Sequence, residues 1–223
     1  MTKWWIIPAG AAVTAAVLVP ARLRVPRAEP RYPESVVTID DAVAHCRDTG
    51  RTGWDLVEYA RMLTHRKYSQ YSILTAWESR DRSFAMSRGF SSQYNGALAV
   101  ILTRLGFEVQ PVFATRVRTG PEPNPWWRMG HSWLRVQHDG RWADVCAYFA
   151  DGPVGAVTFV PVTEVRSFGE RTRRNTVAAM SPFVLGRIWR AILTGSPLPR
   201  WSFRPFGEPI RPEVEKSDVA AET

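Results

Sequence analysis

Cysteine is scarce in this chain, since Cys46 and Cys146 are the only two among 223 residues. One possible pair excludes a disulfide framework, and no CxxC pattern is present that would indicate a structural zinc site. The four histidines also lack the HExxH and HxH spacings that place two imidazoles on one metal ion. The sequence therefore predicts no metal and no other cofactor.

Long hydrophobic runs are also lacking. The longest uncharged apolar stretch, WWIIPAGAAVTAAVLV, covers 16 residues from Trp4 to Val19, fewer than the roughly 20 that span a bilayer comfortably. Arginines follow it at positions 22, 24 and 27, which would keep the main domain on the cytoplasmic side of a membrane. We expect membrane association through this segment. The alternative is a helix of a soluble cytoplasmic protein.

The composition that remains suits one globular domain, because 45% of the residues are hydrophobic and 12% are aromatic. The net charge of +8 favours association with anionic surfaces, and we expect no nucleic-acid partner. Proline and arginine are frequent before position 36, and prolines and acidic residues follow Ser196. We expect a hydrophobic segment and linker at 1–35, the folded domain at 36–195 and an irregular, finally disordered tail at 196–223.

The order of elements indicates an α+β fold, with N-terminal helices, one of them central, packed on an antiparallel sheet. Caps and helical periodicity predict helices, and alternating β-branched and aromatic residues predict strands. The segment RGFSSQYNGALAVILTRLGFEV, residues 88–109, predicts the central helix with a turn before it and a strand after it. The other expected helices are 40–48, 54–63, 80–87 and 181–195, and the expected strands are 107–117, 131–137, 141–148 and 157–162.

A hairpin turn at Asp139-Gly140 decides which side chains share a face of the sheet. With a two-residue turn, His131 lies on the same face as Asp144 and Cys146. Ser91 stands at the start of the central helix, where unpaired backbone N–H groups and a partial positive charge can stabilise a developing oxyanion. An imidazole, an acid and a hydroxyl can therefore belong to one site.

This order of residues resembles the transglutaminase-like superfamily and its arylamine N-acetyltransferase relatives over roughly residues 84–150. Gly89, Ser91 and Tyr94 match the glycine, nucleophile and aromatic positions of the transglutaminase pattern, and Asn95 followed by LGFEV matches the acetyltransferase pattern. GHSWLRV resembles the histidine strand and GRWADV the acid strand. The resemblance implies a papain-like fold and the catalytic set Ser91, His131 and Asp144.

The sequence departs from both family patterns at the nucleophile, where Ser91 replaces cysteine. Serine needs a positioned base before it becomes nucleophilic, so activity does not carry over with the fold. The third position is open as well, because the two patterns place it at Cys146 or at Asp144, and Cys146 is also a candidate relocated thiol. We expect a degenerate, non-catalytic site that binds a peptide or protein segment. The alternative is a Ser-His-Asp acyl transferase or an amide or ester hydrolase.

Each candidate residue also has a purely structural interpretation. Ser91 or Ser92 can cap the central helix, and His131 can be a structural histidine. Asp144 can pair with Arg135, and Cys146 can be a small buried apolar residue.

Overall fold

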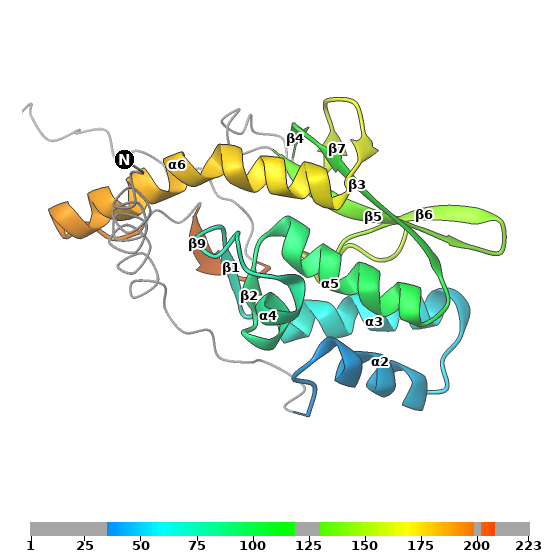
Figure 1. The fold of residues 1–223 in the computed structure, drawn as a ribbon. Coiled ribbons are helices and arrows are strands. Elements are labelled where there is room, and N and C mark those ends of the chain that lie inside the picture. Colours follow the sequence, from blue (N-terminus) through cyan, green and yellow to red (C-terminus); the bar gives the residue numbers. More distant parts are fainter. Residues whose placement is uncertain (1–34, 119–129, 199–201, 208–223) are drawn as a thin grey trace, which may run out of the picture.

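The computed structural model describes residues 35–118, 130–198 and 202–207, and these residues form the α+β fold that the sequence predicts (Figure 1). The segment Trp4–Val19 and the end of the tail, 208–223, lie outside the described residues. The helices are α2 (Ile39–Asp48), α3 (Gly53–Lys67), α4 (Arg80–Ala85), α5 (Ser91–Arg104) and α6 (Glu170–Thr194). The strands are β1 (Gln70–Ser72), β2 (Arg88–Gly89), β3 (Glu108–Ala114), β4 (Val117–Arg118), β5 (His131–His138), β6 (Arg141–Val145), β7 (Val160–Pro161), β8 (Arg166–Ser167) and β9 (Phe203–Pro205).

The first two helices cover α5 on the side away from the sheet. α2 begins after Thr38, whose hydroxyl accepts from the Asp41 backbone N–H at 3.1 Å while the Asp41 carboxylate accepts from the Thr38 N–H at 2.8 Å. This reciprocal capping box satisfies two of the backbone donors that a helix start leaves open. Both α2 and α3 contact α5, which lies between them and the sheet (Figure 1).

The sheet that faces α5 has four strands in the order β6-β5-β3-β8, all paired antiparallel. Asp139 and Gly140 form the turn between β5 and β6 with φ of 51° and 74°, the left-handed values of a two-residue hairpin turn. The pairing places Arg135 directly opposite Asp144. The hairpin at Asp139-Gly140 is therefore confirmed, and with it the shared sheet face.

α5 is the central helix of the main core, and its packing on the sheet confirms the predicted arrangement. It contacts β3 and β5 on one side and α2, α3 and α4 on others. Its apolar side chains meet those of the sheet in one cluster of buried residues, among them Leu98, Ile101, Leu102, Val112, Trp133, Leu134, Val136 and Val145. Burial of apolar surface on this scale is the main stabilising contribution to such a domain.

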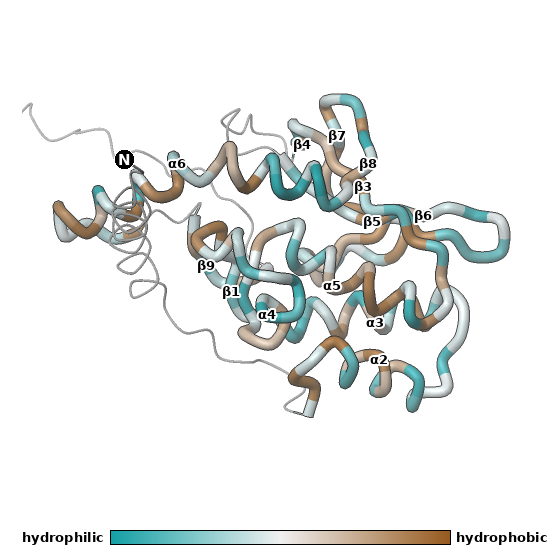
Figure 2. The backbone as a smooth tube through the Cα atoms, in the orientation of Figure 1, coloured by the Kyte–Doolittle hydropathy of each residue, from teal (hydrophilic) through white to brown (hydrophobic). Residues whose placement is uncertain are grey.

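α6 builds a second, smaller core with the segment around β1. Val184 and Ile188 of α6 pack with Leu74 and Phe90, so the residue just before α5 is also held by α6. The helix begins at Glu170 and passes through Pro182, although the sequence favours a start near Ser181. Figure 2 shows hydrophilic residues at the start of α6 and more hydrophobic residues in its later turns. Packing on the second core holds the helix together where proline alone would favour a break.

β9 corrects the expectation of an irregular segment at its position. Phe203–Pro205 pairs antiparallel with β1, in a small sheet of order β2-β1-β9. Arg204 is only 5% exposed and Phe206 only 3%. Sequence reasoning missed this strand because three residues are too few to show a periodicity, and only the pairing with β1 stabilises them.

By length and composition, α6 could cross a membrane, and no other helix among the described residues meets that condition. Only 17% of its most apolar stretch is buried against the rest of the chain. Phe183 and Leu193 are 46% and 78% exposed. Helices of soluble proteins and short leader segments meet the same condition, so this observation places no element in a membrane.

Candidate functional site

The start of α5 is fixed by Gln93 and not by its serines. Phe90 is the N-cap residue in extended conformation, and Ser91 and Ser92 are the first two helical residues. The Gln93 side chain accepts from the Phe90 N–H at 3.2 Å and donates to two backbone carbonyl oxygens before α4 at 2.9 and 3.0 Å. The interpretation of Ser91 or Ser92 as the helix cap is therefore wrong.

At Gly89, just before α5, the backbone passes very close to the side chains of Ser83 and Gln93. A Cβ at this position would lie 2.4 Å from the Ser83 hydroxyl and 3.0 Å from the Gln93 side chain. The Ser83 hydroxyl in turn donates to the Arg88 carbonyl at 2.6 Å. Only glycine fits between these groups, which explains in physical terms the glycine two residues before Ser91.

Ser91 and Ser92 are buried, at 8% and 4% exposure. Among the described residues, neither hydroxyl has a hydrogen-bond partner and no backbone carbonyl accepts from either N–H. The next two N–H groups, of Gln93 and Tyr94, donate to the Phe90 carbonyl at 2.8 and 3.2 Å. The first turn of α5 thus presents two hydroxyls and two backbone donors that have no partner in the described part of the chain.

Asn95, one turn further along the face of α5 that carries Ser91, ties this helix to the ends of β5 and β6. Its side-chain amide donates to the Ser132 carbonyl at 2.7 Å and lies 3.6 Å from the Cys146 sulfur. Its carbonyl oxygen accepts from the Ala147 N–H at 3.0 Å. Sequence reasoning noted Asn95 only as part of a family pattern. The structure shows it as the link between the helix start and the two strand ends.

His131 and Cys146 lie side by side at these strand ends. The His131 Nε2 is 3.3 Å from the Cys146 sulfur. The imidazole also stacks on Trp133, with ring centroids 6.4 Å apart, and meets Phe159 edge-on at 4.7 Å. No hydrogen bond joins His131 to Ser91 within the described part of the chain.

Asp144 points to other partners than His131. Its carboxylate accepts from the Trp133 indole N–H at 3.0 Å and from Arg135 Nε at 3.3 Å. The register of the hairpin explains these partners, because Asp144 lies opposite Arg135. His131 is four residues from Arg135 along β5, which is about 13 Å at roughly 3.3 Å per residue. The expected His131–Asp144 hydrogen bond is absent among the described residues, and the structural interpretation of Asp144 as a partner of Arg135 is confirmed.

Burial keeps both groups of the His131–Cys146 contact neutral. Burial first, and then the charge of Arg204, lowers the pKa of His131 to about 4. Burial raises the pKa of the Cys146 thiol to about 11. A reactive thiol–imidazole pair needs the opposite arrangement, a thiolate beside an imidazolium. At neutral pH the contact is one between an uncharged thiol and an uncharged ring.

Arg204 is a site residue that sequence reasoning did not find. Its Nε donates to the Tyr148 hydroxyl at 2.8 Å, and its guanidinium lies 3.8 Å from the centroid of the Tyr71 ring. Stacking on aromatic faces stabilises a buried guanidinium. The signal that could have indicated it is the aromatic-rich stretch WSFRPF at 201–206.

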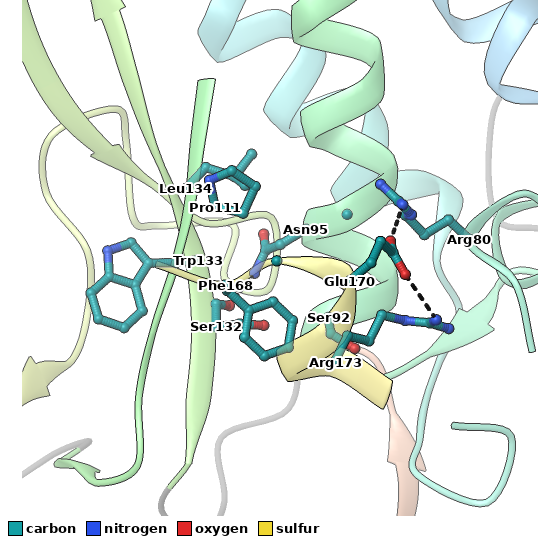
Figure 3. A pocket seen from close by; sticks show the side chains of 12 residues that line it. Arg80, Ser92, Asn95, Pro111, Ser132, Trp133, Leu134, Phe168, Glu170 and Arg173 are labelled. Carbon is teal, nitrogen blue, oxygen red and sulfur yellow. Dashed lines mark hydrogen bonds and ion pairs between the residues drawn. The ribbon is translucent and has the colours of Figure 1, made fainter. Parts of the chain in front are cut away.

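A small cavity of about 40 Å³ opens beside the first turn of α5 (Figure 3). Ser92 and Asn95 line it from α5, Ser132 from β5, and Glu170 and Arg173 from the start of α6. Its lining is mixed, with Pro111, Leu134 and Phe168 beside the polar side chains, and Asn95 belongs both to this lining and to the His131–Cys146 contact. Across the described ranges, no group of three His, Cys, Asp or Glu side chains could hold a metal ion.

Comparisons with known proteins give little beyond this geometry. No protein-family model and no curated protein matches the chain. A solved structure described as the crystal structure of a TGase is similar with a TM-score of 0.39 and 11% sequence identity. The similarity covers 49% of this chain and 30% of that one, so the chain spans less than a third of its length. A likeness at this level carries no argument about function.

Proposed function

We propose that this chain is a non-catalytic binding domain with a degenerate transglutaminase-like site, and that it binds a peptide or protein segment. The neutral contact between His131 and Cys146 is the observation that carries the proposal. In this contact the His131 imidazole faces Cys146, although it is the group that would have to act as a base for Ser91.

The electrostatics of His131 make it a weak base. A general base works best when its pKa lies near the operating pH, and a pKa of about 4 leaves little tendency to take a proton from a serine hydroxyl. Asp144 would raise that tendency by stabilising an imidazolium, but it is bound to Trp133 and Arg135. Ser91 therefore lacks the activation that serine catalysis requires.

The cavity supports binding of a segment of a larger molecule. Small-molecule sites usually enclose roughly 300–1,000 Å³, and this cavity encloses about 40 Å³. Apolar side chains of Pro111, Leu134 and Phe168 line it together with the polar side chains of Ser92 and Ser132. Such a pocket suits one side chain of an extended ligand that continues over the surrounding surface.

Two experiments test the two parts of this proposal. The full-length chain is treated with a fluorophosphonate, which forms a phosphorus–oxygen bond to an activated serine with loss of fluoride, and is compared with Ser91→Ala. We expect no adduct that depends on Ser91.

In the second experiment, short neutral and acidic peptides are titrated into the full-length chain while amide NMR shifts are followed. Saturable shifts at the start of α5 are expected. Absence of such shifts with every peptide would contradict the binding function.

The unpaired N–H groups and hydroxyls at the start of α5 favour a second candidate, a serine acyl transferase or an amide or ester hydrolase. In that case Ser91 attacks a carbonyl, His131 takes and returns the proton, and the two N–H groups stabilise the oxyanion. A Ser91-dependent fluorophosphonate adduct would support this candidate over the non-catalytic one.

Membrane association is the remaining part of the proposal, on the basis of the apolar segment Trp4–Val19 and its basic flank. The full-length chain should sediment with membranes, and a chain that begins at Pro33 should not. If both chains sediment, the segment Trp4–Val19 is not the cause and the exposed apolar side chains of α6 are the next candidate.

A further inference from the structure

Three buried polar atoms around the cavity have no partner. The hydroxyl oxygens of Ser92 and Ser132 and the Nε of Arg173 are almost fully inaccessible and form no hydrogen bond with any described residue. The two serines are only 4% and 5% exposed, and all three residues line the same cavity. Native proteins leave few buried polar groups unpaired, so three at one cavity indicate a missing hydrogen-bonding partner.

All three atoms can donate a hydrogen bond. Each serine hydroxyl offers one O–H, and Nε of an arginine is a donor only. The cavity is also lined by Ser92 in the first turn of α5 and by Glu170 at the start of α6, where helix dipoles favour negative charge. A ligand that completes this set accepts hydrogen bonds and carries negative charge.

The charged side chains that line the cavity also favour a negatively charged ligand. Arg80 and Arg173 both line it, and Glu170 lies between them as a partner of each (Figure 3). Glu170 forms an ion pair with Arg80, and its other carboxylate oxygen is 3.6 Å from Arg173. Arg173 is held in place by a 2.8 Å hydrogen bond from its Nη2 to the Glu78 carbonyl. Among the side chains that line the cavity, two guanidinium groups face one carboxylate, a net charge of +1.

Gly96 makes room for Arg80 at the cavity. It stands in the interior of α5, where glycine is destabilising relative to alanine. A Cβ at this position would lie 2.6 Å from Cδ of Arg80. Glycine at this helical position therefore allows the Arg80 side chain to pass close over α5 and reach Glu170.

We propose that this cavity is a carboxylate-binding subsite, formed by Ser92, Ser132, Arg80 and Arg173, and that Glu170 is the internal carboxylate that a ligand displaces. Glu170 is suited to this because its side chain is 49% exposed and can swing out without loss of core packing. A carboxylate matches the net charge of +1 on the lining side chains better than the more highly charged phosphate does.

The inference deepens the proposed function, because it names the ligand chemistry as an acidic side chain or a terminal carboxylate of a bound segment. It rests on the proposed function in one respect, namely that the carboxylate belongs to a peptide or protein segment. A free small carboxylate would use the same donors.

The test is a titration of the folded full-length chain with acetate, followed through the arginine Nε–H and backbone NMR signals around the cavity. Saturable shifts at Arg173 and Ser92 are expected. Glu170→Gln should strengthen acetate binding at least fivefold, because the competitor is gone. Glu164→Gln is the matched control, since Glu164 pairs with Arg166 outside the cavity, and it should change binding less than twofold.

Arg80→Gln should weaken acetate binding at least fivefold, and Arg82→Gln in the same helix is its control. Arg82 is 57% exposed and does not line the cavity, so less than a twofold change is expected. Equal effects of Glu170→Gln and Glu164→Gln, or of the two arginine variants, would overturn the proposal. Tighter binding of inorganic phosphate than of acetate would overturn the assignment to carboxylate.

Two capped peptides, acetyl-Gly-Glu-Gly-amide and acetyl-Gly-Gln-Gly-amide, distinguish the sources. The glutamate peptide should bind at least tenfold more tightly than acetate and than the glutamine peptide. If acetate binds and neither peptide does, the subsite stands and the peptide function fails. If both peptides bind equally and acetate produces no shift, the peptide function stands and the carboxylate subsite is wrong.

Discussion

The first turn of α5 borders two polar regions that differ in how well their groups are paired. In the first, His131 and Cys146 contact each other and burial keeps both neutral. In the second, the cavity, Ser92, Ser132 and Arg173 have buried atoms without partners among the described residues, and charged side chains surround them. Asn95 belongs to both regions.

This difference separates a structural role from a binding role. A polar group that already has its partner loses a contact when a ligand arrives, whereas an unpaired buried group gains one. Of the residues that the sequence identifies as a catalytic site, His131 and Asp144 already have partners. The region with unpaired donors is formed by residues from α5, β5 and α6, and no sequence pattern indicated it.

Asn95→Leu should have the largest effect, because Asn95 links the two regions. The substitution leaves the Ser132 carbonyl and the Ala147 N–H unpaired in a buried position, and each unpaired group costs about 1–3 kcal/mol. We expect a loss of about 3 kcal/mol in the free energy of unfolding, measured by urea denaturation. Asn175→Leu on the exposed surface of α6 is the control, with a change within about 0.5 kcal/mol. Similar losses for both variants would show that Asn95 is not a structural link.

The pH dependence of stability should identify the neutral state of His131. Its pKa of about 4 in the folded chain is below the ordinary 6.5, so the unfolded state binds more protons between these values. Stability from this group is complete above pH 6.5 and is lost as the pH falls toward 4, by about 3 kcal/mol. Urea denaturation at several pH values should show this slope in the wild type and a smaller one in His131→Gln. Parallel curves would mean that His131 is not held neutral by the fold.

Ser91→Cys should show whether the two regions share a reactive centre. A thiol at the first turn of α5 gains from the helix dipole, whereas burial raises the pKa of Cys46 and of Cys146 to about 11. Iodoacetamide should label residue 91 at least about tenfold faster than either native cysteine, as measured by peptide mass spectrometry. Adding His131→Ala should change that rate less than about twofold, because the ring is neutral and faces Cys146. A drop of about tenfold would instead mean that His131 acts on residue 91, in favour of the serine enzyme.

Arg204→Met should have a smaller effect, a rise in the pKa of His131. Arg204 is the second cause of the lowered pKa of His131, after burial. The variant should raise that pKa above about 4 and leave it below 6.5, because the burial remains. An NMR titration of the His131 Cε1–H, with circular dichroism as a check on folding, measures the change. An unchanged pKa would show that the charge of Arg204 does not reach the imidazole.

The local sequence was sufficient for several elements. The acidic residues at its start predicted the helix at 40–48, and the spacing of apolar residues predicted α5. Asp139-Gly140 predicted the hairpin with its register. These signals are local, because a cap or a two-residue turn involves neighbours in the chain. The register also brought His131 and Cys146 to one face of the sheet, as the sequence predicts.

The contacts of the candidate site and the cavity could not be predicted from the sequence, because they depend on segments that meet only in the folded chain. Asp144 shares a sheet face with His131, but His131 lies too far along β5 to reach it. The Asp144 carboxylate therefore binds Arg135 and Trp133. Arg204 reaches the site only because β9 pairs with β1, a contact between residues more than 130 positions apart. The cavity combines α5, β5 and α6, whose order in the sequence says nothing about the space between them. Sequence patterns determined which side chains share an element, and packing determined which of them meet and which stay unpaired.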